Sequence, residues 1–203
     1  MVASNNTHKL QELREIFTLA GLINVRLIAP RDIGLACDPD ETGETYLDNA
    51  LIKGRAVAKA YRESAHPDEM WVLADDSGLE VDALGGRPGI HSARYHRAAP
   101  GGDGCAALLG EMAAVPEAQR TARFRCVLVL IGPDGREHVF EGVCEGRIAH
   151  DQRGEHGFGF DPVFLVADGR TMAELPAFEK HRISHRGIAG RRAAEFLQRL
   201  GGT

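Results

Sequence analysis

The stretch Val72-Leu73-Ala74-Asp75-Asp76-Ser77-Gly78-Leu79 decides how this chain folds, because an apolar run is followed at once by two carboxylates. The apolar residues are typical of a buried strand, which we expect to end at Ala74. Since successive side chains of an extended segment point to opposite faces, Asp75 and Asp76 should have different roles. A buried carboxylate needs a cation or a donor, and Mg2+ shared with a phosphate substrate would supply one. The alternative is that both aspartates cap a helix or face water.

The composition is that of an ordinary globular protein. The 203 residues are 43% hydrophobic and 26% charged, enough for one substantial core. We expect a single domain over residues 1–203, to which residues near 85–150 could add a lobe. The net charge of -5 argues against nucleic acid as a partner, because broad nucleic-acid binding needs a basic surface. We find neither an apolar run long enough to span a membrane nor a signal peptide, and therefore expect a cytoplasmic protein without a membrane partner.

Apolar periodicity predicts a mixture of helices and strands without internal repeats. Strands are expected at Phe124–Ile131 and Glu137–Val143, joined by the turn Gly132-Pro133-Asp134-Gly135. Ser184 is the expected N-cap of the last helix. Helical spacing is expected near residues 10–20, 47–61, 106–114 and 189–200.

The first chemical motif is Ser4-x-Asn6-x-x-Lys9, at the expected start of the first helix. A helix start offers free backbone N–H groups and a favourable dipole for an anion. The two neutral donors and the cation therefore suit a phosphate. The alternative is that Asn6 or Thr7 only caps the helix while Lys9 lies in solvent.

The second motif is Asp40-Glu41-Thr42-Gly43, followed by Asn49 and Lys53. Asn49 and Lys53 are four residues apart and share one helix face. An acidic residue ahead of that helix could complete a metal site with Asp76. The alternative is that the acidic residues only favour the helix start through its dipole.

The third motif is Gly157-Phe158-Gly159-Phe160-Asp161-Pro162. Aromatic rings between glycines could present their faces to a planar base, and stacking on a base contributes about 1–3 kcal/mol in nucleic-acid complexes. Asp161 could then accept hydrogen bonds from the base. The alternative is that one or both phenylalanines belong to the core.

The fourth motif is Glu179-Lys180-His181-Arg182-Ile183-Ser184-His185-Arg186. We expect its cations to lie at the start of the last helix, where the macrodipole disfavours positive charge. A negative group must then compensate them. A phosphate-bearing ligand and a neighbouring acidic loop are both candidates.

Taken together and in order, these motifs resemble the inosine triphosphate pyrophosphatase family, which hydrolyses non-canonical purine nucleoside triphosphates. The resemblance runs from Ser4 to about Arg186. Its other matching segments are Ala74–Leu79, Pro88-Gly89 with Ser92–Tyr95, and Thr171–Leu175. It implies an α/β fold with a long, curved, mixed central sheet flanked by helices, and two lobes that enclose an active-site cleft. It also implies a homodimer and Mg2+-dependent cleavage of XTP, ITP or dITP to the monophosphate and pyrophosphate, which cleanses the nucleotide pool.

The resemblance also assigns roles to residues. Asp76 would be a metal ligand and the proton acceptor, with Ser77 on the substrate. The second metal carboxylate could be Asp40 or Glu41, of which we favour Glu41. Ser4, Asn6 and Lys9 would hold phosphates, with Lys53 near them. The nucleotide pocket would comprise Phe158, Gly159, Phe160, Asp161, Lys180, His185 and Arg186.

Two features depart from the family pattern. The first strand should be short, since Ser4 stands so near the first residue, and Phe160 stands where the family commonly has tyrosine or tryptophan. Two other functions remain as alternatives. One is a pyrophosphatase resembling the septum-formation inhibitors, which would act on dTTP or UTP. The other is a nucleotide- or RNA-binding module that would need the basic and aromatic residues but neither Asp76 nor Glu41.

Overall fold

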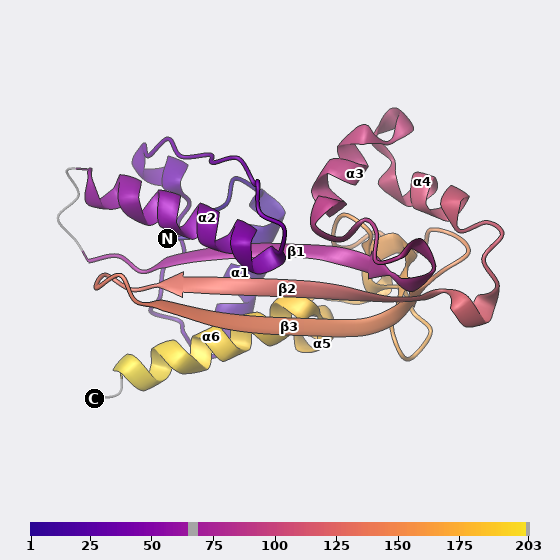
Figure 1. The fold of residues 1–203 in the computed structure, drawn as a ribbon. Helices are drawn as coiled ribbons and strands as arrows, with labels where there is room; N and C mark the ends of the chain where they lie inside the picture. The colour runs from indigo at the N-terminus through magenta and orange to yellow at the C-terminus, as the bar shows by residue number, and fades with distance from the viewer. Residues whose placement is uncertain (65–68, 202–203) are drawn as a thin grey trace. The chain divides into compact units, whose positions relative to one another are not determined.

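The computed structural model describes residues 1–64 and 69–201. They form a four-stranded sheet with helices on its faces, in the order β1-β2-β3-β4 (Figure 1). The strands are β1 (Val72–Val81), β2 (Thr121–Ile131), β3 (Glu137–Ile148) and β4 (Phe164–Leu165). The α-helices are α1 (Thr7–Leu19), α2 (Tyr46–Arg62), α3 (Ser92–Ala98), α4 (Gly104–Glu111), α5 (Ala177–Ile183) and α6 (His185–Gly201). The predicted α/β class, with a helix-flanked sheet, is confirmed.

The chain divides into two compact units, and β1, β2 and β3 each contain residues of both. Unit 1 comprises Met1–Asp76, Cys126–Gly142 and Arg186–Thr203. Unit 2 comprises Ser77–Arg125 and Val143–His185. The prediction of a single domain over residues 1–203 stays a prediction.

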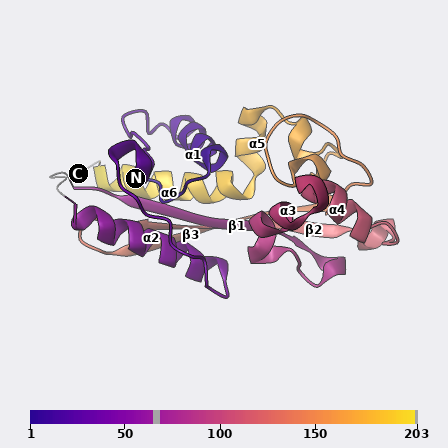
Figure 2. The ribbon, with the colours of Figure 1, turned by 90° about the horizontal axis from the view of Figure 1, so that it is seen from above.

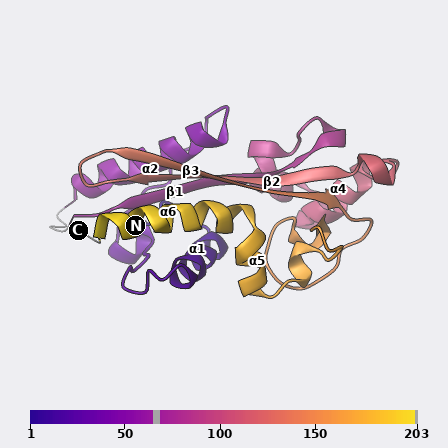
Figure 3. The same ribbon diagram turned by 90° about the horizontal axis from the view of Figure 1, so that it is seen from below.

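In unit 1 the sheet carries helices on both faces. Helices α1 and α6 lie on one face and α2 on the other (Figures 2 and 3). The strand residues alternate accordingly: Leu73 packs in the core of α1 and α6, whereas Val72 and Ala74 pack in the core of α2. In β2 the residues Cys126, Leu128 and Leu130 likewise alternate with Val129 and Ile131. Apolar residues on both faces explain why these strand segments show no polar alternation in the sequence.

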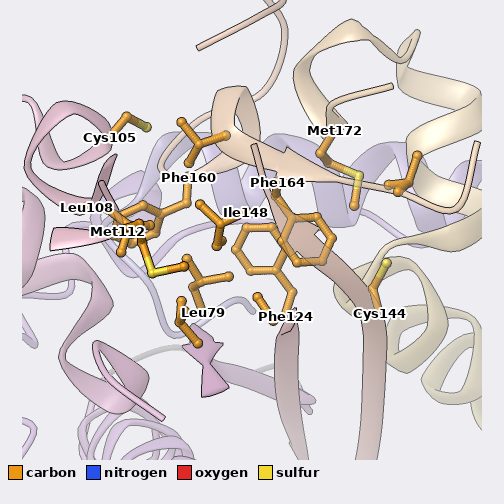
Figure 4. Close-up of a cluster of buried hydrophobic side chains, with 14 of the residues drawn as sticks. Leu79, Cys105, Leu108, Met112, Phe124, Cys144, Ile148, Phe160, Phe164 and Met172 are labelled. Atoms are coloured by element: carbon orange, nitrogen blue, oxygen red, sulfur yellow. The ribbon is translucent and has the colours of Figure 1, made fainter. Parts of the chain in front are cut away.

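In unit 2 one apolar cluster packs around three aromatic rings (Figure 4). The ring centroids of Phe124 and Phe164 lie 4.4 Å apart, and Phe160 belongs to the same cluster. β3 pairs with β4 in antiparallel fashion, Arg147 facing Leu165 and Ile148 facing Phe164. The core of unit 2 therefore includes an aromatic residue of the Gly157–Pro162 motif.

The structure corrects the predicted end of the first buried strand. β1 continues through Asp75 and Asp76 to Val81, so the expectation that it ends at Ala74 is wrong. The strand tolerates two buried carboxylates because each has cationic partners from helices far along the chain. The short first strand is reduced to one isolated parallel bridge, between Val2 and Leu73.

The structure also corrects the helix assignment near residue 180. Lys180, His181 and Arg182 lie in the last turn of the separate helix α5, where the dipole favours cations. The prediction that they lie at the start of the last helix is therefore wrong. Ser184 has an extended conformation and separates α5 from α6, which begins at His185. No helix among the described residues is long and apolar enough to cross a membrane.

Candidate active site

Asp75 and Asp76 are both buried in β1 and have different partners. Asp75 contacts residues of α1 and α6, on the face of Leu73. Asp76 contacts residues of α2, on the face of Ala74. The prediction that adjacent strand positions separate the two carboxylates is therefore confirmed, and each face can be described by itself.

On the Asp76 face, two carboxylates converge on one lysine. The Nζ atom of Lys53 lies 2.5 Å from Oε1 of Glu41 and 3.4 Å from Oδ1 of Asp76. Asp40, the other candidate in the acidic loop, is exposed. The two carboxylates come from segments 35 residues apart, because Glu41 precedes α2 and Asp76 lies in β1.

The electrostatics of this face keep Lys53 charged and raise the pKa of Asp76. Burial alone would lower the pKa of Lys53, but Asp76, Asp75 and Glu41 raise it above its usual value. Burial raises the pKa of Asp76 above its usual value, and the nearby carboxylates of Glu41 and Asp75 raise it further. The ammonium groups of Lys53 and Lys9 act in the opposite direction and lower it. A group of carboxylates that exceeds its cations in this way would be stabilised by a further positive charge.

Across the strand, Asp75 is the centre of a buried ion cluster. Its Oδ1 lies 3.1 Å from Nζ of Lys9, and its Oδ2 lies 3.1 Å from Nη2 of Arg186. Nη1 of Arg186 donates to Oε2 of Glu12 at 2.6 Å. Burial alone would raise the pKa of Asp75, but Lys9 and Arg186 hold it well below its usual range. Asp75 thus acts as a structural acceptor, a role different from that of Asp76.

Glu12 is the member of this cluster that the sequence analysis missed. It is buried in α1, one turn after Lys9. The signal was available, because residues three apart share a helix face and Lys9 was already a candidate. Nothing local, however, pairs Glu12 with Arg186.

At the start of α1, the capping alternative describes Asn6. Its Oδ1 accepts hydrogen bonds from the backbone N–H groups of His8 and Lys9 at 3.0 and 3.2 Å. Ser4 Oγ accepts from the backbone N–H of Asn6 at 3.1 Å. The cap leaves the Nδ2 donor of Asn6 on an exposed side chain. The alternative that Lys9 lies in solvent is wrong, because Lys9 is paired with Asp75.

In unit 2, Lys180 and Asp161 form a buried ion pair, with Nζ 2.5 Å from Oδ2. The same Oδ2 accepts from the backbone N–H of Phe158 at 2.8 Å, and Nζ of Lys180 lies 5.4 Å from the centre of the Phe158 ring. Gly157 has a φ of +76°, and a Cβ there would lie 2.0 Å from Oδ2 of Asp161. Only glycine permits this close approach, so the motif folds around its own carboxylate.

The two phenylalanines of this loop have different surroundings. Phe160 is buried, and its ring centroid lies 5.8 Å from that of Tyr95, so the core alternative describes Phe160. Phe158 is half-buried beneath the Lys180 ammonium. The carbonyl oxygen of Gly159 lies 3.2 Å from Sγ of Cys105. One ring therefore anchors the loop while the other is partly accessible.

The remaining predicted residues of unit 2 are His185 and Ser77. The His185 ring is buried and stacks on Phe124, with centroids 4.7 Å apart and an interplanar angle of 14°. Ser77 is half-buried in β1, next in sequence to Asp76.

This geometry coincides with a match to a known family. The model described as the Ham1 family matches residues 1–196. The chain belongs to the Ham1 family.

Ham1 relatives cover nearly the whole chain. A dITP/XTP pyrophosphatase of Symbiobacterium thermophilum is 45% identical over 207 residues, which cover 98% of this chain and 95% of that protein. A dITP/XTP pyrophosphatase of Bacillus subtilis is 43% identical, with 98% and 96% covered. The solved structure of a HAM1 protein from Coxiella burnetii superposes with a TM-score of 0.82 at 36% identity, covering 98% of this chain and 97% of that one. The family resemblance predicted from the motifs is confirmed.

Few protein side chains of this site could bind a cation, and they are the carboxylates of Asp76 and Glu41. Among residues 1–64 and 69–201, no three His, Cys, Asp or Glu side chains are grouped so that they could hold a metal ion. The Asp76 and Glu41 pair fits a cation that takes one or two protein carboxylates and completes its shell with substrate phosphate and water, as Mg2+ does. The donor chemistry therefore suits Mg2+ bound together with a nucleotide.

Proposed function

We propose that this chain hydrolyses the non-canonical purine nucleoside triphosphates XTP, ITP and dITP to the monophosphate and pyrophosphate, with Mg2+. The observation that carries the proposal is the convergence of Asp76 and Glu41 on Lys53, in a chain whose relatives are named dITP/XTP pyrophosphatases. Those relatives confirm the prediction of a nucleoside-triphosphate pyrophosphatase, and hence of a hydrolase in nucleotide metabolism.

Asp76 and Glu41 would hold the metal ion. When bound, Mg2+ would neutralise part of the triphosphate charge and polarise the phosphoryl oxygens. In the reaction, water attacks the α-phosphorus and the bond to the pyrophosphate oxygen breaks. We assign Asp76 as the acceptor of the water's proton, the role that the family resemblance implies.

Cations and neutral donors of unit 1 would bind the phosphates. Lys53 is charged and half-buried, so its ammonium keeps more of its electrostatic effect than a lysine in bulk water. Lys9 presents a second ammonium at the start of α1, and the Asn6 cap orients an amide donor there. Ser4 holds the backbone of Asn6 and offers its hydroxyl as a further donor. Such charges act best when they are positioned before the reaction begins.

Residues of unit 2 would recognise the base. We propose that Phe158 stacks on the purine and that Lys180, held by Asp161, donates to its carbonyl oxygens. Gly159 and Phe160 shape the loop, and His185 and Ser77 complete the contacts to the substrate. Arg186 belongs to unit 1 and would support the proposed site there through Asp75 and Glu12. A pocket of donors would disfavour adenine, whose 6-amino group is itself a donor.

A substrate panel tests this function. Pyrophosphate release should be fastest with XTP, ITP and dITP, slow with ATP and GTP, and absent without Mg2+. Equal efficiency on ATP and ITP would refute the proposed selectivity, and preference for dTTP or UTP would favour the septum-inhibitor alternative. Nucleotide binding without turnover would favour the binding module.

The variant Asp76→Asn tests the assignment of the metal ligand. It keeps the shape of the side chain and removes the charge, so it should abolish turnover while the melting temperature shows a folded protein. Near-normal turnover would contradict the assignment. We further propose a homodimer that acts in the cytoplasm to cleanse the nucleotide pool, and light scattering of the purified protein would test the dimer.

A further inference from the structure

Asn49 is a fully buried polar residue in the first turns of α2. Asparagine is a poor helix former, and a buried amide is costly unless it is hydrogen-bonded. Its presence here therefore calls for specific partners, and both of its amide atoms have one.

The amide of Asn49 joins the acidic loop to β1. Its Oδ1 accepts from the backbone N–H of Gly43 at 2.8 Å, and its Nδ2 donates to Oδ2 of Asp76 at 3.2 Å. The orientation is unambiguous, because the backbone N–H can only donate and an ionised carboxylate can only accept. Asn49 thus ties together two segments that are 33 residues apart in the chain.

Gly43 makes the bridge possible. A Cβ at Gly43 would lie 2.5 Å from Cβ of Asp48 and 2.8 Å from Oδ1 of Asn49. Distances under 3.0 Å require something to shift. Any larger residue would therefore push the loop away from the amide.

The bridge fixes the orientation of the Asp76 carboxylate. It engages Oδ2 of Asp76, while Oδ1 faces Lys53 at 3.4 Å. Lys53 in turn lies 2.5 Å from Glu41, which is two residues ahead of Gly43. One amide therefore constrains both the rotation of Asp76 and the position of the loop that carries Glu41.

We infer that Asn49 is a positioning residue that fixes the orientation of the Asp76 carboxylate and the place of the loop that carries Glu41, the two groups proposed to hold the divalent cation. The inference rests on the proposed function only in naming those two carboxylates as the cation's ligands. Asn49 does not ligate the cation; it acts through the two residues that do. Residues that orient metal ligands commonly change metal affinity about 10- to 100-fold when they are replaced.

Direct Mn2+ binding tests the inference without turnover. Electron paramagnetic resonance of free Mn2+ gives the dissociation constant for the wild type, Asn49→Ala and Asn49→Asp. We expect Asn49→Ala to bind Mn2+ about 10- to 100-fold more weakly. Asn49→Asp should also bind more weakly than the wild type, because it places a carboxylate against Asp76 in place of a donor. An unchanged constant in Asn49→Ala, or a wild type that binds no Mn2+, would overturn the inference.

Asp48→Ala is the matched control for helix stability. Oδ2 of Asp48 accepts from the N–H and the hydroxyl of Thr45 at 3.1 and 2.7 Å, which closes the capping box of the same helix. This variant should lower the melting temperature while its Mn2+ constant stays within about twofold of wild type. If it weakens Mn2+ binding as much as Asn49→Ala, then Asn49 only stabilises the helix, and the inference fails.

Gly43→Ala attacks the other end of the bridge. It should reproduce the Mn2+ defect of Asn49→Ala, and the double variant should be no worse than either single one, because partners in one interaction are not additive. Fully additive losses would contradict a shared bridge. The Mg2+ concentration for half-maximal turnover should rise in parallel. If the wild type turns over no purine triphosphate, the proposed function fails, whereas the Mn2+ constants still report on the bridge.

Discussion

Replacing Asp75 with asparagine should destabilise the protein strongly. The Asp75 side chain is fully buried, and it is the shared acceptor of Lys9 and Arg186. Asparagine keeps the shape, but one of its two terminal atoms becomes an NH2 group that faces a cationic donor. Glu12 remains to compensate Arg186 in part, while Lys9 loses its carboxylate partner. Removing one partner from a buried ion pair costs about 3–5 kcal/mol.

Thermal and urea unfolding, followed by circular dichroism, measure this loss. For a domain of this size, 1 kcal/mol corresponds to about 2–4 °C in Tm, so the expected decrease is about 6–20 °C. The control is Glu137→Gln, which removes a carboxylate from the exposed pair with Arg55. Exposed pairs contribute about 0–1 kcal/mol, so this variant should stay within about 4 °C of wild type. If the free energy of unfolding of Asp75→Asn also lies within 1 kcal/mol of the wild-type value, the ion cluster does not stabilise the fold as argued.

Three further predictions concern acid stability, the glycine at position 157 and the buried Arg120. Because the folded pKa of Asp75 is depressed, the stability that this carboxylate gives the fold should be complete above about pH 4 and should decline as the pH falls toward the folded pKa. Asp75→Asn should flatten this part of an acid-unfolding profile, and an unaltered profile would contradict the assignment. Gly157→Ala should raise KM for XTP at least severalfold, because the new Cβ would displace Asp161. The control is Gly135→Ala, where φ is similarly positive but no atom lies near the new Cβ, so only stability should change. Equal KM values for the two variants in steady-state assays would refute this prediction. Arg120→Met should cost about 3 kcal/mol or more in urea unfolding, since the buried guanidinium donates to the carbonyl oxygens of Met112, Ile148 and Ala149, and a loss below 1 kcal/mol would count against that role.

The helices and the inner strands could be predicted because their signals are local. The expected helix near residues 47–61 is α2 (Tyr46–Arg62), and the expected strand Phe124–Ile131 lies within β2. Apolar spacing, capping residues and turn glycines report on neighbours within a few positions. The opposite directions of Asp75 and Asp76 follow from the same kind of rule, the two-residue period of a strand.

The partners of the charged residues could not be predicted, because they are distant in the chain. Arg186 meets Asp75 across 111 residues and Glu12 across 174 residues. Without those partners, Asp75 and Asp76 indicated the end of a strand, whereas the folded chain continues β1 to Val81. Likewise the sequence placed Lys180 at the start of the last helix, where its charge is unfavourable, whereas in the folded chain Ser184 separates α5 from α6 and Lys180 lies near the end of α5.

The sequence by itself determined the family, the secondary structure around the motifs, and the division of labour between two adjacent aspartates. The tertiary structure decided that Lys9 pairs with Asp75, that Glu41 rather than Asp40 meets Lys53, and that Asn49 links the acidic loop to Asp76. The physical reason is that local periodicity is set by backbone geometry, whereas a buried charge is stable only beside whichever partners the whole fold brings to it.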